Sequence, residues 1–193
     1  MQTVFVTGGA GTLGRAVVAD LEGRGWRVVA PGRADADLFD AAAVTAAVDA
    51  AAGVAEAPLK GVVNVVGGFA DGQGIADTPV DDFEAMFRLN LRATYLVTQA
   101  AIPHLGADGA IVNVSSRAAL KPFAGAAGYC ASKAALITLT EVTALEGVRC
   151  NVVLPSGIGG DAVPPEDIAP VIAHLLSADS RATSGASVPV YGA

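Results

Sequence analysis

A tyrosine and a lysine stand four residues apart in the stretch "GYCASKAAL", residues 128–136. Residues four apart share one face of an α-helix, so Tyr129 and Lys133 can reach the same point. A phenol with a pKa of about 10 exchanges protons poorly at neutral pH, and a nearby ammonium favours the phenolate. The chain has only two other lysines, Lys60 and Lys121, which disfavours a coincidental surface pair. The spacing predicts a proton-exchanging tyrosine whose pKa the lysine lowers.

A glycine-rich stretch, "VTGGAGTLGR", places Gly8, Gly11 and Gly14 between a predicted strand and a predicted helix. Glycines let the backbone approach a pyrophosphate, and the helix N-terminus turns unpaired N–H groups toward it. A tight structural turn is the alternative, which the tyrosine–lysine pair downstream makes less attractive. We interpret the stretch as a phosphate-binding loop for a dinucleotide.

Short β-branched runs alternate with longer segments rich in Ala and Leu, which is typical of βαβ units and a parallel sheet. A chain of 193 residues with 52% hydrophobic residues favours one domain, residues 1–193. We therefore predict an α/β fold with a doubly wound parallel sheet of six to seven strands. The predicted strands are Thr3–Val6, Arg27–Ala30, Gly61–Val66, Ala110–Val114, Arg149–Val153 and Ser187–Val190, and the predicted helices are Leu13–Glu22, Asp40–Ala52, Pro79–Leu105, Ala127–Glu146 and Pro165–Ser177.

Two local features refine this prediction. The connection "PGRADADLF" after the second strand is shorter than the dozen or more residues that a parallel crossover requires, so the edge crossover is expected to be truncated. Residues 36–38 can form at most a short strand at the sheet edge. In the helix expected from Pro79, with Thr78 as its N-cap, Asn90 lies on a face that is otherwise apolar or small, and a buried amide needs partners.

Composition and charge exclude several classes of protein. No apolar run approaches the roughly 18–20 residues that cross a bilayer, and the N-terminus lacks the pattern of a signal peptide, so we expect a cytoplasmic protein without membrane contact. A net charge of −7 without a basic cluster argues against nucleic acid as a partner. Cys130 and Cys150 lack metal-binding spacing, and His104 and His174 lack partners at catalytic spacing, so no metal site is predicted.

Six segments together resemble the short-chain dehydrogenase/reductase family, over essentially the whole chain and in the family's order. They are "TGGAGTLG", "NVVGG", "RLNL", "IVNVSS", "YCASK" and "NVVLPSG". The chain departs from the family where Thr12 replaces a glycine, where Val65 and Val66 replace the middle of Asn-Asn-Ala-Gly, and where Ser156 replaces the glycine of Pro-Gly. The stretch "VVGGFADG", residues 65–72, also looks like the corresponding turn of dihydropteridine reductase, a short family member, which makes a pterin one candidate substrate.

The resemblance implies a Rossmann fold and four catalytic residues: Asn90, Ser116, Tyr129 and Lys133. Ser116 stands 13 positions before Tyr129, at the interval of the family's carbonyl-binding serine, and Ser115 is the competing assignment. Asn90 would hold a proton-relaying water, unless it is a packing residue bonded to backbone. The implied cofactor-binding residues are Gly8, Gly11, Thr12, Leu13, Gly14, Arg33, Asp37, Leu38, Val66, Gly67, Tyr129, Lys133, Pro155, Ser156 and Ile158.

The choice between NADP(H) and NAD(H) depends on the end of the second strand. A carboxylate there binds the ribose 2′-hydroxyl, whereas an arginine favours a 2′-phosphate. This chain has Gly32 at the expected position of the acid, followed by Arg33, which favours NADP(H) and leaves NAD(H) possible. Asp37 resembles the family's adenine-contacting aspartate.

These observations predict an NADP(H)-dependent oxidoreductase that acts on a small carbonyl or alcohol substrate. The alternative is a non-catalytic NAD(P)-binding regulatory module, because only "SGIGGDAVP" stands where the family usually carries a substrate-covering segment. The helices that carry Asn90 and Tyr129 are apolar or small on more than one face, so we expect a homodimer or homotetramer formed through them.

Overall fold

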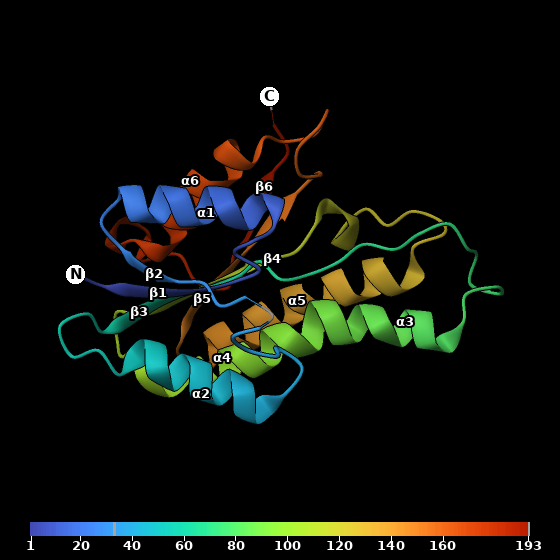
Figure 1. Cartoon of the computed structure of the whole chain (residues 1–193). Coiled ribbons are helices and arrows are strands. Elements are labelled where there is room, and N and C mark those ends of the chain that lie inside the picture. Colours follow the sequence, from blue (N-terminus) through green and yellow to red (C-terminus); the bar gives the residue numbers. More distant parts are fainter. Residues whose placement is uncertain (33, 193) are drawn as a thin grey trace.

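Six parallel strands in the described part of the chain form one sheet in the order β2-β1-β3-β4-β5-β6 (Figure 1). The computed structural model describes residues 1–32 and 34–192. From β1 the chain adds β2 on one side and β3 on the other, so the strand order reverses direction between β1 and β3. In a doubly wound sheet, such a reversal opens a crevice at the carboxyl ends of the strands. The predicted doubly wound sheet of six to seven strands is confirmed, with six. The strands are β1 (Thr3–Thr7), β2 (Arg27–Val29), β3 (Leu59–Asn64), β4 (Ala110–Val114), β5 (Arg149–Pro155) and β6 (Ser187–Val190).

Helices cover both faces of the sheet, with α1 and α6 on one side and α2, α4 and α5 on the other (Figure 1). Side chains alternate along a strand, so Val4 and Val6 pack toward the first layer and Phe5 packs toward the second. No helix of the described residues is long and apolar enough to cross a membrane. The helices are α1 (Thr12–Gly23), α2 (Ala41–Ala52), α3 (Val80–Phe87), α4 (Ala93–Leu105), α5 (Ala127–Leu145) and α6 (Pro165–Leu176).

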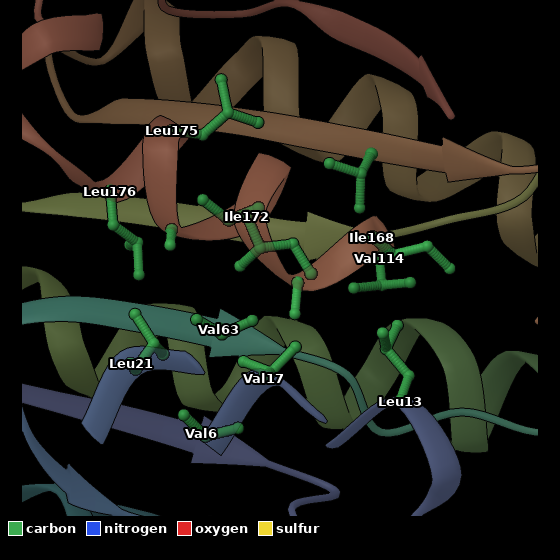
Figure 2. Packing of buried hydrophobic residues seen from close by; sticks show 14 of the residues in the cluster. Val6, Leu13, Val17, Leu21, Val63, Val114, Ile168, Ile172, Leu175 and Leu176 are labelled. Atoms are coloured by element: carbon green, nitrogen blue, oxygen red, sulfur yellow. The ribbon is translucent and has the colours of Figure 1, made fainter. Parts of the chain in front are cut away.

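The apolar layer between α1, α6 and the sheet holds the glycine-rich loop in place. Figure 2 shows Leu13, Val17 and Leu21 of α1 packed with valines of the central strands and with α6. Leu13 is 3% exposed, so its side chain anchors the first turn of α1 in the core. This packing fixes the start of α1 at the carboxyl end of β1, where the crevice opens.

The sheet ends at β2 on one side, as the short connection predicts. After Val29 the described residues pass through turns and enter α2 at Ala41 without a crossover helix. The segment 36–38 forms no strand, although Ala36 is buried. Asp40 caps α2, because its carboxylate accepts a hydrogen bond from the Ala43 N–H at 2.7 Å.

The long helix predicted from Pro79 to Leu105 is continuous but not uniformly α-helical. Between α3 and α4, residues Arg88–Arg92 form a π-helix with Asn90 at its centre. Such wide turns often mark functional sites. The prediction of Thr78 as the N-cap is wrong, because its hydroxyl donates to the Gly74 carbonyl at 2.9 Å and Pro79 occupies the cap position.

Candidate active site

The phosphate loop leaves no room for side chains at two of its glycines. Gly8 has a φ of +70°, and a Cβ there would lie 2.9 Å from the Val66 nitrogen. A Cβ on Gly14 would lie 2.1 Å from the Gly8 carbonyl oxygen. The loop therefore packs tightly against the residues that follow β3. This close packing explains why glycine stands at both positions.

The first turn of α1 faces the crevice with its backbone. Gly11 is the N-cap, and within the described residues no side chain caps this end and no acidic residue lies in the first turn. N–H groups at such a helix end bind phosphate well. Since the Leu13 side chain is in the core, Thr12, Leu13 and Gly14 can offer a ligand their backbone here.

Gly67 lies where the end of β3 meets two polar side chains. A Cβ at this position would stand 2.8 Å from Asn90 Oδ1 and 3.1 Å from Lys133 Nζ. The Val66 N–H donates to Thr7 Oγ1 at 3.2 Å, which ties this turn to β1. The structure thus brings the phosphate loop, Asn90 and Lys133 together around one small residue.

Asn90 is fully buried, and its side-chain amide is bonded to the protein. Its Oδ1 accepts from the Gly68 N–H at 2.9 Å, while its Nδ2 donates to the Gly68 carbonyl at 3.2 Å and to Ser132 Oγ at 2.9 Å. The amide therefore fixes the turn after β3 to helix α5. These contacts match the backbone-bonded asparagine that the sequence left as an alternative, and the water relay stays a prediction.

Lys133 is buried with its ammonium in a polar niche. The side chain is 5% exposed, and Nζ donates to the Val114 carbonyl at 3.0 Å, at the end of β4. Burial lowers the pKa of this lysine from 10.5 to about 8, because the charged form loses hydration. At neutral pH the ammonium is still mostly protonated.

The two serines after β4 have different partners. Ser115 Oγ donates to the Lys133 carbonyl at 2.7 Å and so ties β4 to α5. Ser116 Oγ accepts from the Ala118 N–H at 3.1 Å and lies close enough to the Tyr129 phenol to lower its pKa. Of the two, Ser116 is therefore the one placed at the phenol.

Tyr129 lies in the first turn of α5 and is partly buried. Burial raises the pKa of its phenol above 10, and the nearby Ser116 hydroxyl opposes this shift. Burial therefore acts against the predicted lowering of this pKa, and the lowering by Lys133 together with an oxidised nicotinamide ring stays a prediction. Lys133 shares the helix face but directs its ammonium to the Val114 carbonyl.

The position of Tyr129 depends on a close helix contact. A Cβ on Gly128 would lie 3.1 Å from the Phe83 carbonyl oxygen and 3.3 Å from Met86 Cβ. Glycine lets the first turn of α5 approach α3 directly. The same contact places Tyr129 beside the π-helical turn that carries Asn90.

The turn after β5 closes back on the phosphate loop. Pro155 ends β5, and Ser156 donates its N–H to the Val190 carbonyl at 3.2 Å. Ile158 pairs with Val163 in an isolated bridge and is 42% exposed. A Cβ on the neighbouring Gly159 would lie 3.8 Å from Thr12 Cγ2, so this short turn borders the crevice.

The end of β2 contains a carboxylate that the motif analysis did not single out. The Gly32 N–H donates to Asp35 Oδ2 at 2.8 Å, and this oxygen lies 3.3 Å from the position of a Cβ on Gly32. Arg33, the predicted phosphate-binding residue, lies outside the described residues. Asp37 Oδ1 accepts from the Phe39 N–H at 2.9 Å, and Leu38 packs against the α2–α4 core.

Sequence reasoning also missed two other site residues. Ser132 bridges Asn90 and the Tyr129 carbonyl, and its place one residue before Lys133 could have suggested this. Phe69 stands edge-on to the Tyr129 ring, with ring centroids 4.9 Å apart. The feature of the sequence that could have revealed Phe69 is its position directly after the Gly67–Gly68 pair. Within the described ranges, no three His, Cys, Asp or Glu side chains gather as a metal site would require.

Known proteins are similar to this chain in sequence. The chain is 31% identical to human (3R)-3-hydroxyacyl-CoA dehydrogenase over 97% of its length and 93% of that protein. It is 32% identical to bovine L-xylulose reductase over 97% of its length and 94% of that protein. These matches carry the family resemblance, whereas the local likeness to dihydropteridine reductase stays a prediction.

A solved structure and a family model agree with these relatives. The short-chain dehydrogenase/reductase from Serratia marcescens superposes with a TM-score of 0.86 at 29% identity, covering 98% of this chain and 95% of that one. The family model for short chain dehydrogenases matches residues 33–167. The chain therefore belongs to the short-chain dehydrogenase family.

Proposed function

We propose that this protein is an NADP(H)-dependent oxidoreductase that interconverts a carbonyl compound and its alcohol. The observation that carries the proposal is that Lys133 and Tyr129 both lie against the turn after β3, which Asn90 holds in place, with Ser116 near the phenol. The phosphate loop fits a dinucleotide because Gly8 and Gly14 have no room for side chains and the first turn of α1 faces the crevice with its backbone. The bound nicotinamide would supply or accept the hydride.

Each residue then has a separate task. The Ser116 hydroxyl donates a hydrogen bond to the substrate oxygen and stabilises the negative charge that develops there during reduction. The Tyr129 phenol gives its proton to that oxygen in reduction and takes one back in oxidation. Lys133 binds the hydroxyls of the nicotinamide ribose, and Asn90 holds the Gly67–Gly68 turn against Lys133.

The raised pKa of Tyr129 bears on the direction of proton transfer. Burial keeps the phenol protonated, which suits a group that must donate a proton. The reverse reaction needs the phenolate, which the positive charge of an oxidised nicotinamide and of the Lys133 ammonium would stabilise. In the protein without cofactor the phenol is therefore in the protonated form, from which reduction of a carbonyl group starts.

The rival function is a non-catalytic NAD(P)-binding module. Its support is the short turn after β5, which leaves little chain to cover a substrate. The retained Ser116 hydroxyl favours the enzyme, because a module that only senses the cofactor has no need of a donor beside Tyr129. A turnover screen with NADPH against ketones, aldehydes, quinones and a quinonoid dihydropterin distinguishes the two functions. Saturable turnover supports the enzyme, and its absence in a folded protein that binds NADPH supports the module.

We also propose that two copies of the chain pair through the outer face of α3, α4 and α5. A groove there is lined by residues of both charges and by apolar side chains: Phe39, Asp81, Glu84, Ala85, Phe87, Arg88, Leu91, Arg92, Tyr95, Ala135 and Leu139. A two-fold interface needs a self-complementary surface, and the two acids and two arginines of this groove provide one. A second copy of this chain is therefore its proposed occupant.

Replacing Tyr129 with Phe should lower turnover about 10²- to 10⁴-fold, because a positioned proton donor is lost. Binding of NADPH, measured by fluorescence titration, should change little because Lys133 remains. Tyr95→Phe, in the groove on the outer face of α4, serves as the matched control for loss of a phenol hydroxyl. A Tyr129→Phe protein with turnover within about tenfold of wild type would contradict the acid–base role.

Two substitutions at the end of β2 should shift cofactor preference in opposite directions. Arg33→Asp should favour NADH by removing a phosphate partner, whereas Asp35→Asn should favour NADPH by removing a carboxylate that repels the 2′-phosphate. The readout is the ratio of the dissociation constants for NADPH and NADH. Asp37→Asn is the control, because it would affect binding of the adenine of NADPH and of NADH alike. If neither substitution moves the ratio, the preference is set elsewhere.

Lys133 should make stability depend on pH. Its pKa of about 8 in the folded protein lies below the ordinary value of 10.5, so the unfolded chain binds more protons between these values. The free energy of unfolding of the wild type, relative to Lys133→Met, should therefore rise as the pH increases from about 8 to 10. Urea denaturation at several pH values measures this difference, with Lys121→Met as control. A constant difference would show that Lys133 is not buried with a lowered pKa.

The wild-type protein should be a dimer or tetramer at micromolar concentration. A charge among the apolar lining residues of the groove, Leu139→Asp, should shift the mass measured by light scattering toward the monomer. Leu145→Asp, on the same helix but outside the groove and 87% exposed, should leave the mass unchanged. A monomeric wild type would rule out this interface.

A further inference from the structure

Two phenylalanine side chains remain open to solvent beside the proposed catalytic tyrosine. Phe69 is 56% exposed and Phe123 is 47% exposed. The Phe69 ring stands perpendicular to the Tyr129 ring at 4.9 Å, and its centroid lies 6.3 Å from that of Phe123. The chain has only nine phenylalanines and tyrosines in all. Three of them meet at this point, which concentrates apolar surface next to the phenol.

The backbone holds both rings in place. Asn90 binds the N–H and the carbonyl of Gly68, so the residue before Phe69 is fixed from both sides. Farther along the same loop, the Gly72 N–H donates to the Gly125 carbonyl at 3.0 Å, which joins this loop to the one that carries Phe123. Gly125 has a φ of +84°, a conformation that glycine adopts readily. The two loops therefore form one wall next to the phenol.

Packing within the protein accounts for only part of this arrangement. Rings that served the core alone would be buried, yet about half of each ring surface is open. Neither phenylalanine lines the groove on the outer face of α3–α5, so the proposed pairing of subunits does not require them. Exposed aromatic surface beside a reacting group is suited to bind an apolar part of the substrate.

We propose that Phe69 and Phe123 bind a flat apolar group attached directly to the reacting carbonyl, so that aryl ketones and the matching alcohols are the preferred substrate class. This inference rests on the proposed oxidoreductase function and makes its substrate more specific. Because Phe69 touches Tyr129, a ring against this wall brings its attached carbonyl oxygen to the phenol and to Ser116. Aromatic pairs prefer edge-to-face or offset contacts, which distinguishes a phenyl ring from a saturated ring of similar size.

The test compares acetophenone with cyclohexyl methyl ketone, which has the same number of carbon atoms but no aromatic ring. The wild type should have a kcat/KM for acetophenone about two- to tenfold higher, after correction for the intrinsic reactivity of the two ketones with borohydride. Phe69→Leu and Phe123→Leu keep apolar volume but remove a ring, so each should move the corrected ratio toward one. Ile75→Ala, an exposed position on the same loop, should leave it unchanged.

A binding measurement separates this inference from the proposed function. Saturation-transfer NMR should show the acetophenone ring in contact with the wild-type protein, and the contact should weaken in Phe69→Leu. Contact of acetophenone without turnover of any carbonyl compound would support the aryl-binding role of Phe69 and Phe123 and would overturn the proposed oxidoreductase function. Turnover of aliphatic ketones with a corrected ratio near one, unchanged by either substitution, would overturn the wall alone. A wild type that shows neither contact nor preference would also overturn it.

Discussion

The hydrogen bonds between the Asn90 amide and the backbone of Gly68 hold the site together. They reach from the π-helical turn between α3 and α4 to the turn that follows β3, and they fix two neighbours of Gly68 at once. On one side Gly67 lies against Lys133, and on the other Phe69 lies against Tyr129. When an amide is hydrogen-bonded to both the N–H and the carbonyl of one residue, it fixes the orientation of that residue as well as its position.

Much of the fold could be predicted from the sequence, because alternating apolar periods and glycine spacing are local signals. The strands and helices, the six-stranded sheet and the truncated edge all follow from such patterns. The π-helix could not be predicted, because widening of the turn around Asn90 is set by contacts with Gly68 and Ser132 from distant parts of the chain. The type of Thr78, followed by Pro79, indicates a cap, but the Thr78 hydroxyl is satisfied by the Gly74 carbonyl of the loop before it.

The site shows the same division between local and distant causes. Tyr129 and Lys133 belong to one helix, so their spacing indicated a shared face, but their pKa values depend on burial by other elements. Burial raises the pKa of the phenol and lowers that of the ammonium to about 8, and each shift favours the neutral form. Phe69 was missed because its partner, the Tyr129 ring, lies far away in the sequence on α5. Asp35 has a local partner, the Gly32 N–H three residues before it, so only the motif analysis passed over it.

The loops that follow the carboxyl ends of the strands shape the crevice. The turn after β5 passes close to Thr12 and so borders the phosphate side of the crevice. The opposite side depends on the loops joined by the bond from Gly72 to Gly125. Because these loops are anchored through Gly68 to the same asparagine, the apolar surface beside Tyr129 cannot shift without disturbing the niche of Lys133. The surface proposed to select the substrate and the groups proposed to be catalytic are therefore coupled through one buried amide.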